Sequence, residues 1–139
     1  MPQTYQSITV NAPIERVWGQ LSNFHDMSWA PHVVERCDAV GDKTGTEPGA
    51  QRVLNEAFHE TLLEVDPVGH QLRYSIDDGP SPVSSADVRN YIGTIHLVAD
   101  TINNTTLVEW ASSWESANDE AESFCHGIYV ALLKELAQQ

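Results

Sequence analysis

Residues 117–136 form the clearest helical pattern of the chain, and they follow a run of short segments typical of strands. Their apolar side chains recur every three or four positions and so share one helical face: Ala117, Ala121, Phe124, Cys125, Ile128, Leu132 and Leu136. An antiparallel sheet with one apolar face needs an element to cover that face. The sequence therefore predicts a C-terminal helix packed on a sheet, with either core or cavity between them.

The segments before this helix predict the sheet itself. Strand-forming composition or alternation occurs at residues 4–10, 33–40, 51–57, 58–65, 71–77, 91–98 and 106–114. After the first of these, Asn11 as a cap and Pro13 in the first turn favour a short helix that ends near residue 22. Residues 24–27 can form a second helical turn. We expect an α+β fold in which about seven antiparallel strands curve round the C-terminal helix.

The composition narrows the class of protein. With 139 residues and 41% hydrophobic residues, the chain is expected to form one domain with a sizeable core. Its formal charge of -13 repels phosphate backbones and anionic lipids, so nucleic acid is not an expected partner. No apolar stretch approaches the ~20 residues that cross a bilayer. The first residues lack a signal-peptide pattern, which predicts a cytoplasmic protein without membrane insertion.

Metal and cofactor motifs are absent from the sequence. Cys37 and Cys125 lie far apart without C-x-x-C spacing, and we expect both to behave as small apolar residues. Cys125 and His126 are adjacent, so on a helix they point about 100° apart and do not form a catalytic pair. His25, Asp26 and His32 lack any recognised metal-ligand spacing. We therefore predict no metal and no cofactor.

Seven short motifs, in this order, resemble the START-like superfamily: ITVNAPIERVW (8–18), FHDMSWAP (24–31), GAQR (49–52), ETL (60–62), YSI (74–76), RNY (89–91) and VEW (108–110). The superfamily includes Bet v 1 allergens and proteins of the polyketide cyclase/dehydrase type. The resemblance covers essentially the whole chain and implies the helix-grip fold, with a ligand cavity between sheet and C-terminal helix.

Within the superfamily, the chain is also similar to the plant abscisic-acid receptors. That similarity implies cavity positions at Glu60, Tyr74, Ile76, Tyr91, Phe124, Ile128 and Leu132. Trp29, Arg52 and Trp110 complete the predicted ligand-contacting set. Glu35 stands where the receptors place a lysine for the hormone's carboxylate, and the gating loop is much shorter here. The bacterial lipid-carrier and cyclase-like branch is therefore the nearer comparison.

The sequence alone does not decide which side chains of two predicted strands point into the protein. The resemblance places Glu60 inside, whereas alternation puts Thr61, Leu63 and Val65 on the more apolar face. A bulge near residue 57 or 58 would reverse the facing, because one extra residue inverts the parity of a strand. We predict an inward Glu60. In residues 106–114, polarity places Trp110 and Trp114 inside, but the receptor comparison would place Glu109 there.

An inward Glu60 has several chemical uses. Enclosed by aromatic side chains, its carboxyl group would have a raised pKa unless Arg52 or Arg89 pairs with it. It could orient a ligand hydroxyl, act as a general acid or base, or form an ion pair that joins two strands. Tyr74 and Tyr91 could offer hydroxyls to a ligand, or bond to backbone or water at the edge of the core.

Three functions follow in order of preference. The first is binding of a small hydrophobic or amphipathic molecule, such as a lipid or a polyketide-like or aromatic compound, in an internal cavity. The second is a polyketide cyclase/dehydrase-type enzyme, with Glu60 as the candidate catalytic residue beside Tyr74, Tyr91 and Arg52. The third is a non-catalytic interaction module. The predicted partner is a small hydrophobic ligand, and the chain is expected to be a monomer or a homodimer.

Overall fold

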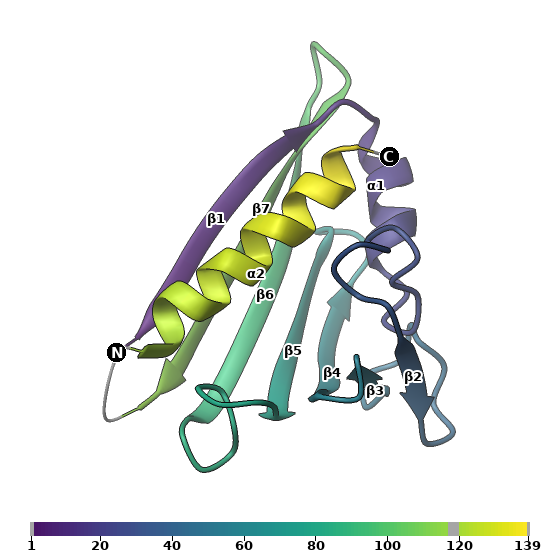
Figure 1. The fold of residues 1–139 in the computed structure, drawn as a ribbon. Helices are drawn as coiled ribbons and strands as arrows, with labels where there is room; N and C mark the ends of the chain where they lie inside the picture. The colour runs from purple at the N-terminus through teal and green to yellow at the C-terminus, as the bar shows by residue number, and fades with distance from the viewer. Residues whose placement is uncertain (1, 117–119, 139) are drawn as a thin grey trace.

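A curved sheet, crossed on one face by a long helix, makes up the computed structural model, which describes residues 2–116 and 120–138 (Figure 1). The helices and strands follow in the order β1 (Gln3–Val10), α1 (Ile14–Leu21), β2 (Cys37–Val40), β3 (Gln51–Leu54), β4 (Phe58–Asp66), β5 (Gln71–Asp78), β6 (Arg89–Asp100), β7 (Thr105–Glu115) and α2 (Glu120–Ala137). The predicted helix-grip α+β architecture is confirmed.

All seven strands belong to one antiparallel sheet in the order β1-β7-β6-β5-β4-β3-β2. Strands β2 to β7 are hairpin neighbours along the chain, and β1 returns to pair with β7. Figure 1 shows α2 running diagonally across the sheet on the side of β1, while α1 and the following loop lie at the other side. Among the described residues, α2 is the one long helix, and it packs against β1.

Several predicted boundaries differ from the structure. Residues 24–27 form turns rather than a helical turn, and the predicted strand 33–40 is a strand only at Cys37–Val40. The segments predicted at 51–57 and 58–65 are two strands joined by a tight turn, in which Asn55 and Glu56 both have positive φ. Asn55 also accepts backbone hydrogen bonds from Glu35 and Arg36 through its side chain, which ties the loop before β2 to this turn.

The two helices begin differently from the prediction. Pro13, and not Asn11, is the N-cap residue of α1, and no side chain caps this helix. Helix α2 is described from Glu120, so the predicted Ala117 lies outside the described residues. Gly127, in the middle of α2, is exposed, and an added Cβ would meet no atom within 4 Å.

The pairing of β4 with β5 is irregular on either side of Glu60. Between His59 and Glu60 the extra residue belongs to β5, whose paired residue changes from Asp78 to Ile76, whereas between Leu62 and Glu64 the extra residue is Leu63 of β4. Glu60 and Leu62 alternate with Thr61 and both point into the protein, while Leu63 is exposed. The inward Glu60 is confirmed, although the bulge of β4 lies at Leu63 and not at the predicted residue 57 or 58.

Strand β7 follows the polarity of its sequence. Trp110 and Trp114 are buried, at 2% and 0% exposure, while Glu109 lies on the other face and accepts a hydrogen bond from Tyr5. His96 contacts the same carboxylate at 3.1 Å. The receptor-based alternative for this strand is therefore wrong.

Candidate functional site

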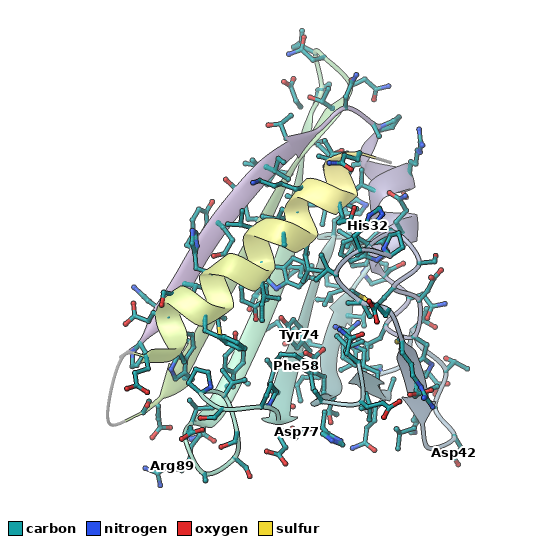
Figure 2. All side chains as sticks on the ribbon, in the orientation of Figure 1. His32, Asp42, Phe58, Tyr74, Asp77 and Arg89 are labelled. Atoms are coloured by element: carbon teal, nitrogen blue, oxygen red, sulfur yellow. The ribbon has the colours of Figure 1, made fainter. Side chains whose placement is uncertain are left out.

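A pocket of about 160 Å³ lies between α2 and the inner face of the sheet. Its walls come from β3 to β7, from the middle of α2 and from the loop between α1 and β2. In Figure 2, Tyr74 and Phe58 occupy the interior beside α2, and His32 lies near the C-terminal end of this helix. The sequence predicts either core or cavity between this helix and the sheet, and the structure has a pocket there.

Eight of the predicted ligand contacts line this pocket: Arg52, Glu60, Tyr74, Ile76, Tyr91, Trp110, Ile128 and Leu132. Two do not. Trp29 is buried with its ring centre 6.5 Å from that of Trp110, so it packs beside a lining residue instead of lining the pocket. Phe124 is half-buried and packs against the core. Whether the eight contact a ligand stays a prediction.

Eight further lining residues were missed: Met27, Val33, Val34, Leu54, Asn55, Phe58, Cys125 and Tyr129. Cys125 was assigned to the buried helix face but not to the site. Tyr129 lies four residues after Cys125 and three before Leu132, so helical spacing alone could have placed it on the inner face. Met27, Val33 and Val34 come from a loop whose path no periodicity describes.

Arg52 and Glu60 form a buried ion pair at the pocket wall. The register of β3 and β4 places them directly opposite each other. Arg52 Nε and Nη2 lie 2.8 and 2.6 Å from the same atom, Glu60 Oε1. Arg52 Nη1 also donates to the Phe24 carbonyl at 3.0 Å, and the guanidinium carbon lies 3.8 Å from the centre of the Phe24 ring. The pair thus joins β3, β4 and the loop after α1.

The two oxygens of Glu60 are used unequally. Both Arg52 contacts end on Oε1, and no hydrogen bond among the described residues ends on Oε2. Burial raises the pKa of Glu60, and the neighbouring Arg52 charge opposes this rise. Arg89, the other predicted partner, is exposed. The carboxylate therefore has one oxygen committed to Arg52 and one that is free to accept.

Three tyrosines and a tryptophan of the pocket wall form a chain of hydrogen bonds, called here the tyrosine chain. Trp110 Nε1 donates to the Tyr74 hydroxyl at 3.0 Å. The Tyr129 hydroxyl lies 2.9 Å from that of Tyr74 and 2.5 Å from that of Tyr91. Tyr74 and Tyr91 therefore have a side-chain partner, Tyr129, in place of the predicted backbone or water.

These phenols stay protonated at neutral pH. Burial is the main cause that raises the pKa values of Tyr74, Tyr91 and Tyr129 above the ordinary tyrosine value. Protonated phenols can both donate and accept hydrogen bonds. The three tyrosines therefore give the pocket wall hydroxyl groups that can form hydrogen bonds and that carry no charge.

The pattern of motifs, the helix-grip fold and the pocket agree with one family profile. The profile described as polyketide cyclase/dehydrase and lipid transport matches residues 1–139. The chain belongs to this family. The members of the polyketide cyclase/dehydrase family typically bind hydrophobic ligands. A comparison with curated protein sequences finds no significant match.

Solved structures of similar proteins support the assignment. A protein from Nitrosospira multiformis is 47% identical, with a TM-score of 0.97 over 99% of this chain and 94% of its own. The protein XoxI from Bacillus cereus is 28% identical, with a TM-score of 0.81 over 99% of this chain and 94% of its own. A major latex-like protein from Panax ginseng, 11% identical with a TM-score of 0.78, covers 98% of this chain and 95% of its own and shares the fold. Among the described helices, none has the length and apolar character needed to span a bilayer.

Proposed function

We propose that this chain binds a small, mainly apolar molecule in the pocket between α2 and the sheet. The observation that carries the proposal is the pocket wall itself, in which aromatic and aliphatic side chains surround a small number of polar atoms. Ligand pockets commonly have this composition, because apolar area supplies affinity and a few polar groups fix orientation. Membership of a family whose description includes lipid transport supports the same function.

The volume of the pocket limits the ligand. Pockets for drug-sized molecules occupy roughly 300–1,000 Å³, whereas an apolar cavity of roughly 150 Å³ holds one benzene molecule. At about 160 Å³, this pocket matches one aromatic ring with a short substituent. A longer acyl chain would need the loop containing Val33 and Val34 to move away from α2.

Two measurements test the proposal. Native mass spectrometry of the purified protein should show an excess mass that disappears on denaturation. NMR titration with ethylbenzene, a one-ring apolar probe, should shift the resonances of residues in α2 and β5. If the purified protein carries no extra mass and ethylbenzene shifts no resonance, the proposal is wrong.

A pair of tryptophan variants tests whether the ligand binds in this pocket. Ile128→Trp fills the pocket from α2 and should abolish both signals. Ser123→Trp adds the same side chain at an exposed position of the same helix and should preserve them. Equal loss in both variants would point to damage of the helix rather than to occupation of the pocket.

The free oxygen of Glu60 supports a second candidate function, proton transfer to or from a bound carbonyl compound. A buried carboxylate with a raised pKa is suited to general acid–base chemistry. Glu60→Gln would keep the shape and remove the proton-accepting group. Loss of turnover of a poly-carbonyl substrate with retained binding would support this function, and unchanged turnover would exclude Glu60 as the catalytic residue.

A further inference from the structure

The hydrogen bonds among Tyr74, Tyr129 and Tyr91 leave one hydroxyl proton without a tyrosine acceptor. Tyr74, Tyr129 and Tyr91 carry three hydroxyl protons, and the two oxygen–oxygen contacts between them use two. The Trp110 N–H occupies the Tyr74 oxygen as a donor and cannot accept the third proton. Whichever way the chain is oriented, one phenol therefore has a proton without a tyrosine acceptor.

The protein offers only modest acceptors for this third proton. Cys125 and Ser112 interact with the Tyr91 hydroxyl. A thiol is a weak acceptor, and the Ser112 hydroxyl shares its hydrogen-bonding capacity with that of Thr4, which lies 2.6 Å away. Because Tyr74, Tyr91, Tyr129 and Cys125 all line the pocket, a carbonyl or ether oxygen placed there can compete with these acceptors for the proton.

Glu60 offers an unused hydrogen-bond acceptor, in contrast to the extra donor proton of the tyrosines. Its Oε2 atom accepts no hydrogen bond among the residues that the structure describes, although Glu60 also lines the pocket. Glu60 pairs with Ile76 and Leu62 with Tyr74, so Glu60 and Tyr74 are diagonal neighbours on adjacent strands. Side chains in this relation start roughly 7–8 Å apart. The spare acceptor and the spare donor thus belong to one space without satisfying each other.

A charged ligand suits this site poorly. The Arg52 guanidinium already uses four of its five N–H donors on Glu60 Oε1, the Phe24 carbonyl and the Met27 sulfur. The Arg52–Glu60 pair compensates its own charge, and the remaining wall is uncharged. An ion entering the pocket would lose its hydration and would meet only charges that are already paired with each other.

We propose that the pocket selects a neutral one-ring molecule that bears both a hydrogen-bond acceptor, bound by the tyrosine chain, and a hydroxyl donor, bound by Glu60 Oε2. This inference rests on the proposed ligand-binding function and specifies its substrate class. Hydroxylated aromatic ketones and aldehydes have this chemistry. Plain hydrocarbons fill the same volume but leave both polar groups of the pocket unused.

Four probes of similar size test the two hydrogen bonds separately: ethylbenzene, acetophenone, 4-ethylphenol and 4-hydroxyacetophenone. Their dissociation constants are measured by NMR titration or calorimetry at about pH 6, where phenols are uncharged. Each correctly placed polar group should tighten binding about three- to tenfold, because a net hydrogen bond contributes in that range. The compound with both groups should bind most tightly.

Two variants sharpen the test. In Glu60→Gln, the amide oxygen can keep Arg52 while the NH₂ group faces the pocket and cannot accept the phenol proton. It can only donate to the phenol oxygen, so the preference for 4-ethylphenol over ethylbenzene should fall. Glu64→Gln makes the same change at an exposed position of β4 and should leave all four constants unaltered. Tyr129→Phe cuts the chain and leaves Tyr74 and Tyr91 each with an unused proton, so the preference for acetophenone over ethylbenzene should persist.

The outcomes separate this inference from the function on which it rests. If the four probes bind with equal affinity, the pocket is a ligand site and the inferred selectivity is wrong. If none binds, ethylbenzene included, the inferred selectivity is wrong, and the ligand-binding function fails with it when the purified protein also carries no extra mass. A rank order that follows the two polar groups, and changes in Glu60→Gln but not in Glu64→Gln, supports both.

Discussion

Tyr129 is the side chain on which the buried polar contacts of the pocket converge. Tyr129→Phe removes the hydroxyl that joins Tyr74 to Tyr91 and leaves both of those hydroxyls without their tyrosine partner. Because each hydrogen bond contributes about 0.5–1.5 kcal/mol, the loss of two should lower the free energy of unfolding by about 1–3 kcal/mol. Urea denaturation followed by tryptophan fluorescence measures the change.

Tyr5→Phe is the matched control for this variant. Tyr5 is 59% exposed and its hydroxyl donates to Glu109, so water can replace the lost contact. We expect a change within about 0.5 kcal/mol. Equal effects of the two substitutions would mean that the buried chain of hydroxyls contributes nothing to stability.

The sequence predicted single residues well where polarity and resemblance agreed. Tyr74 and Ile76 alternate with polar neighbours, and both line the pocket. Tyr129 and Phe58 were missed, because an aromatic residue within an apolar stretch has the same pattern whether it packs in a core or faces a pocket. The pairing of Tyr129 with two tyrosines on different strands depends on the final packing of α2, which local pattern does not encode.

Helix α2 contains an interior glycine that the packing does not require. Gly127 is exposed and an added Cβ would touch nothing within 4 Å, so Gly127→Ala should raise the free energy of unfolding by about 0.5–1 kcal/mol. Thermal and urea unfolding measure the gain.

Gly93 provides the contrasting case on β6. It lies opposite Tyr74 in the sheet, and an added Cβ would overlap the Tyr74 ring and hydroxyl. Gly93→Ala should therefore destabilise the protein by about 1–3 kcal/mol, as overpacking of a core does. A stability gain at Gly93, or a loss at Gly127, would contradict this assignment of the two glycines.

The C-terminal turn of α2 is tied to the loop after α1 by Glu135 and His32. The Glu135 carboxylate accepts from the His32 backbone N–H at 2.7 Å and contacts its ring nitrogen at 3.0 Å. These contacts lower the pKa of Glu135 below its ordinary value of 4.5. A carboxylate with a lowered pKa stabilises the folded state fully above its ordinary pKa and loses this effect as the pH falls through the lowered value.

Glu135→Gln should therefore be less stable than the natural protein near neutral pH, with a difference that shrinks in acid. Urea midpoints of both proteins at about pH 7 and about pH 3 measure this difference. Glu64→Gln removes the same charge at an exposed position of β4 and controls for net charge. A difference that is constant from neutral pH to acid would show that the Glu135 carboxylate does not stabilise the fold.

The order and type of the strands and helices were predictable, but their edges were not. The period of two in β5 and the apolar helical face of α2 were correct because each pattern continues over several turns or pairs. The predicted strand 33–40 shortened to Cys37–Val40, since Asn55 holds the preceding backbone in a loop through side-chain hydrogen bonds. The irregular pairing of β4 with β5 depends on both strands, so alternation alone could not place it.

For the chain as a whole, repulsion among the acidic side chains destabilises the compact folded state. The formal charge is -13, and the ion pairs Arg36–Asp38, Arg36–Glu56 and Arg73–Glu64 are largely exposed. Since the Debye length falls from about 30 Å at 0.01 M salt to about 3 Å at 1 M, salt screens the repulsion among the acidic groups. The midpoint of thermal unfolding should rise with sodium chloride over that range.

The same salt series near the sequence pI of about 4.5 is the control. There the net charge is close to zero, so the salt dependence should largely disappear. A midpoint that falls with salt at neutral pH would mean that the exposed ion pairs stabilise the chain more than the net repulsion destabilises it.

The loop between α1 and β2 supplies Met27, Val33 and Val34 to the pocket, yet it contributes no strand to the sheet. Its residues can therefore be exchanged without breaking the pairing of β-strands. Descendants of such a gene can acquire a new ligand by changing this one stretch while α2 and the sheet are inherited intact. The sheet and α2 maintain the architecture, and the loop between α1 and β2 is the part most open to divergence. Separate regions of the gene encode the two.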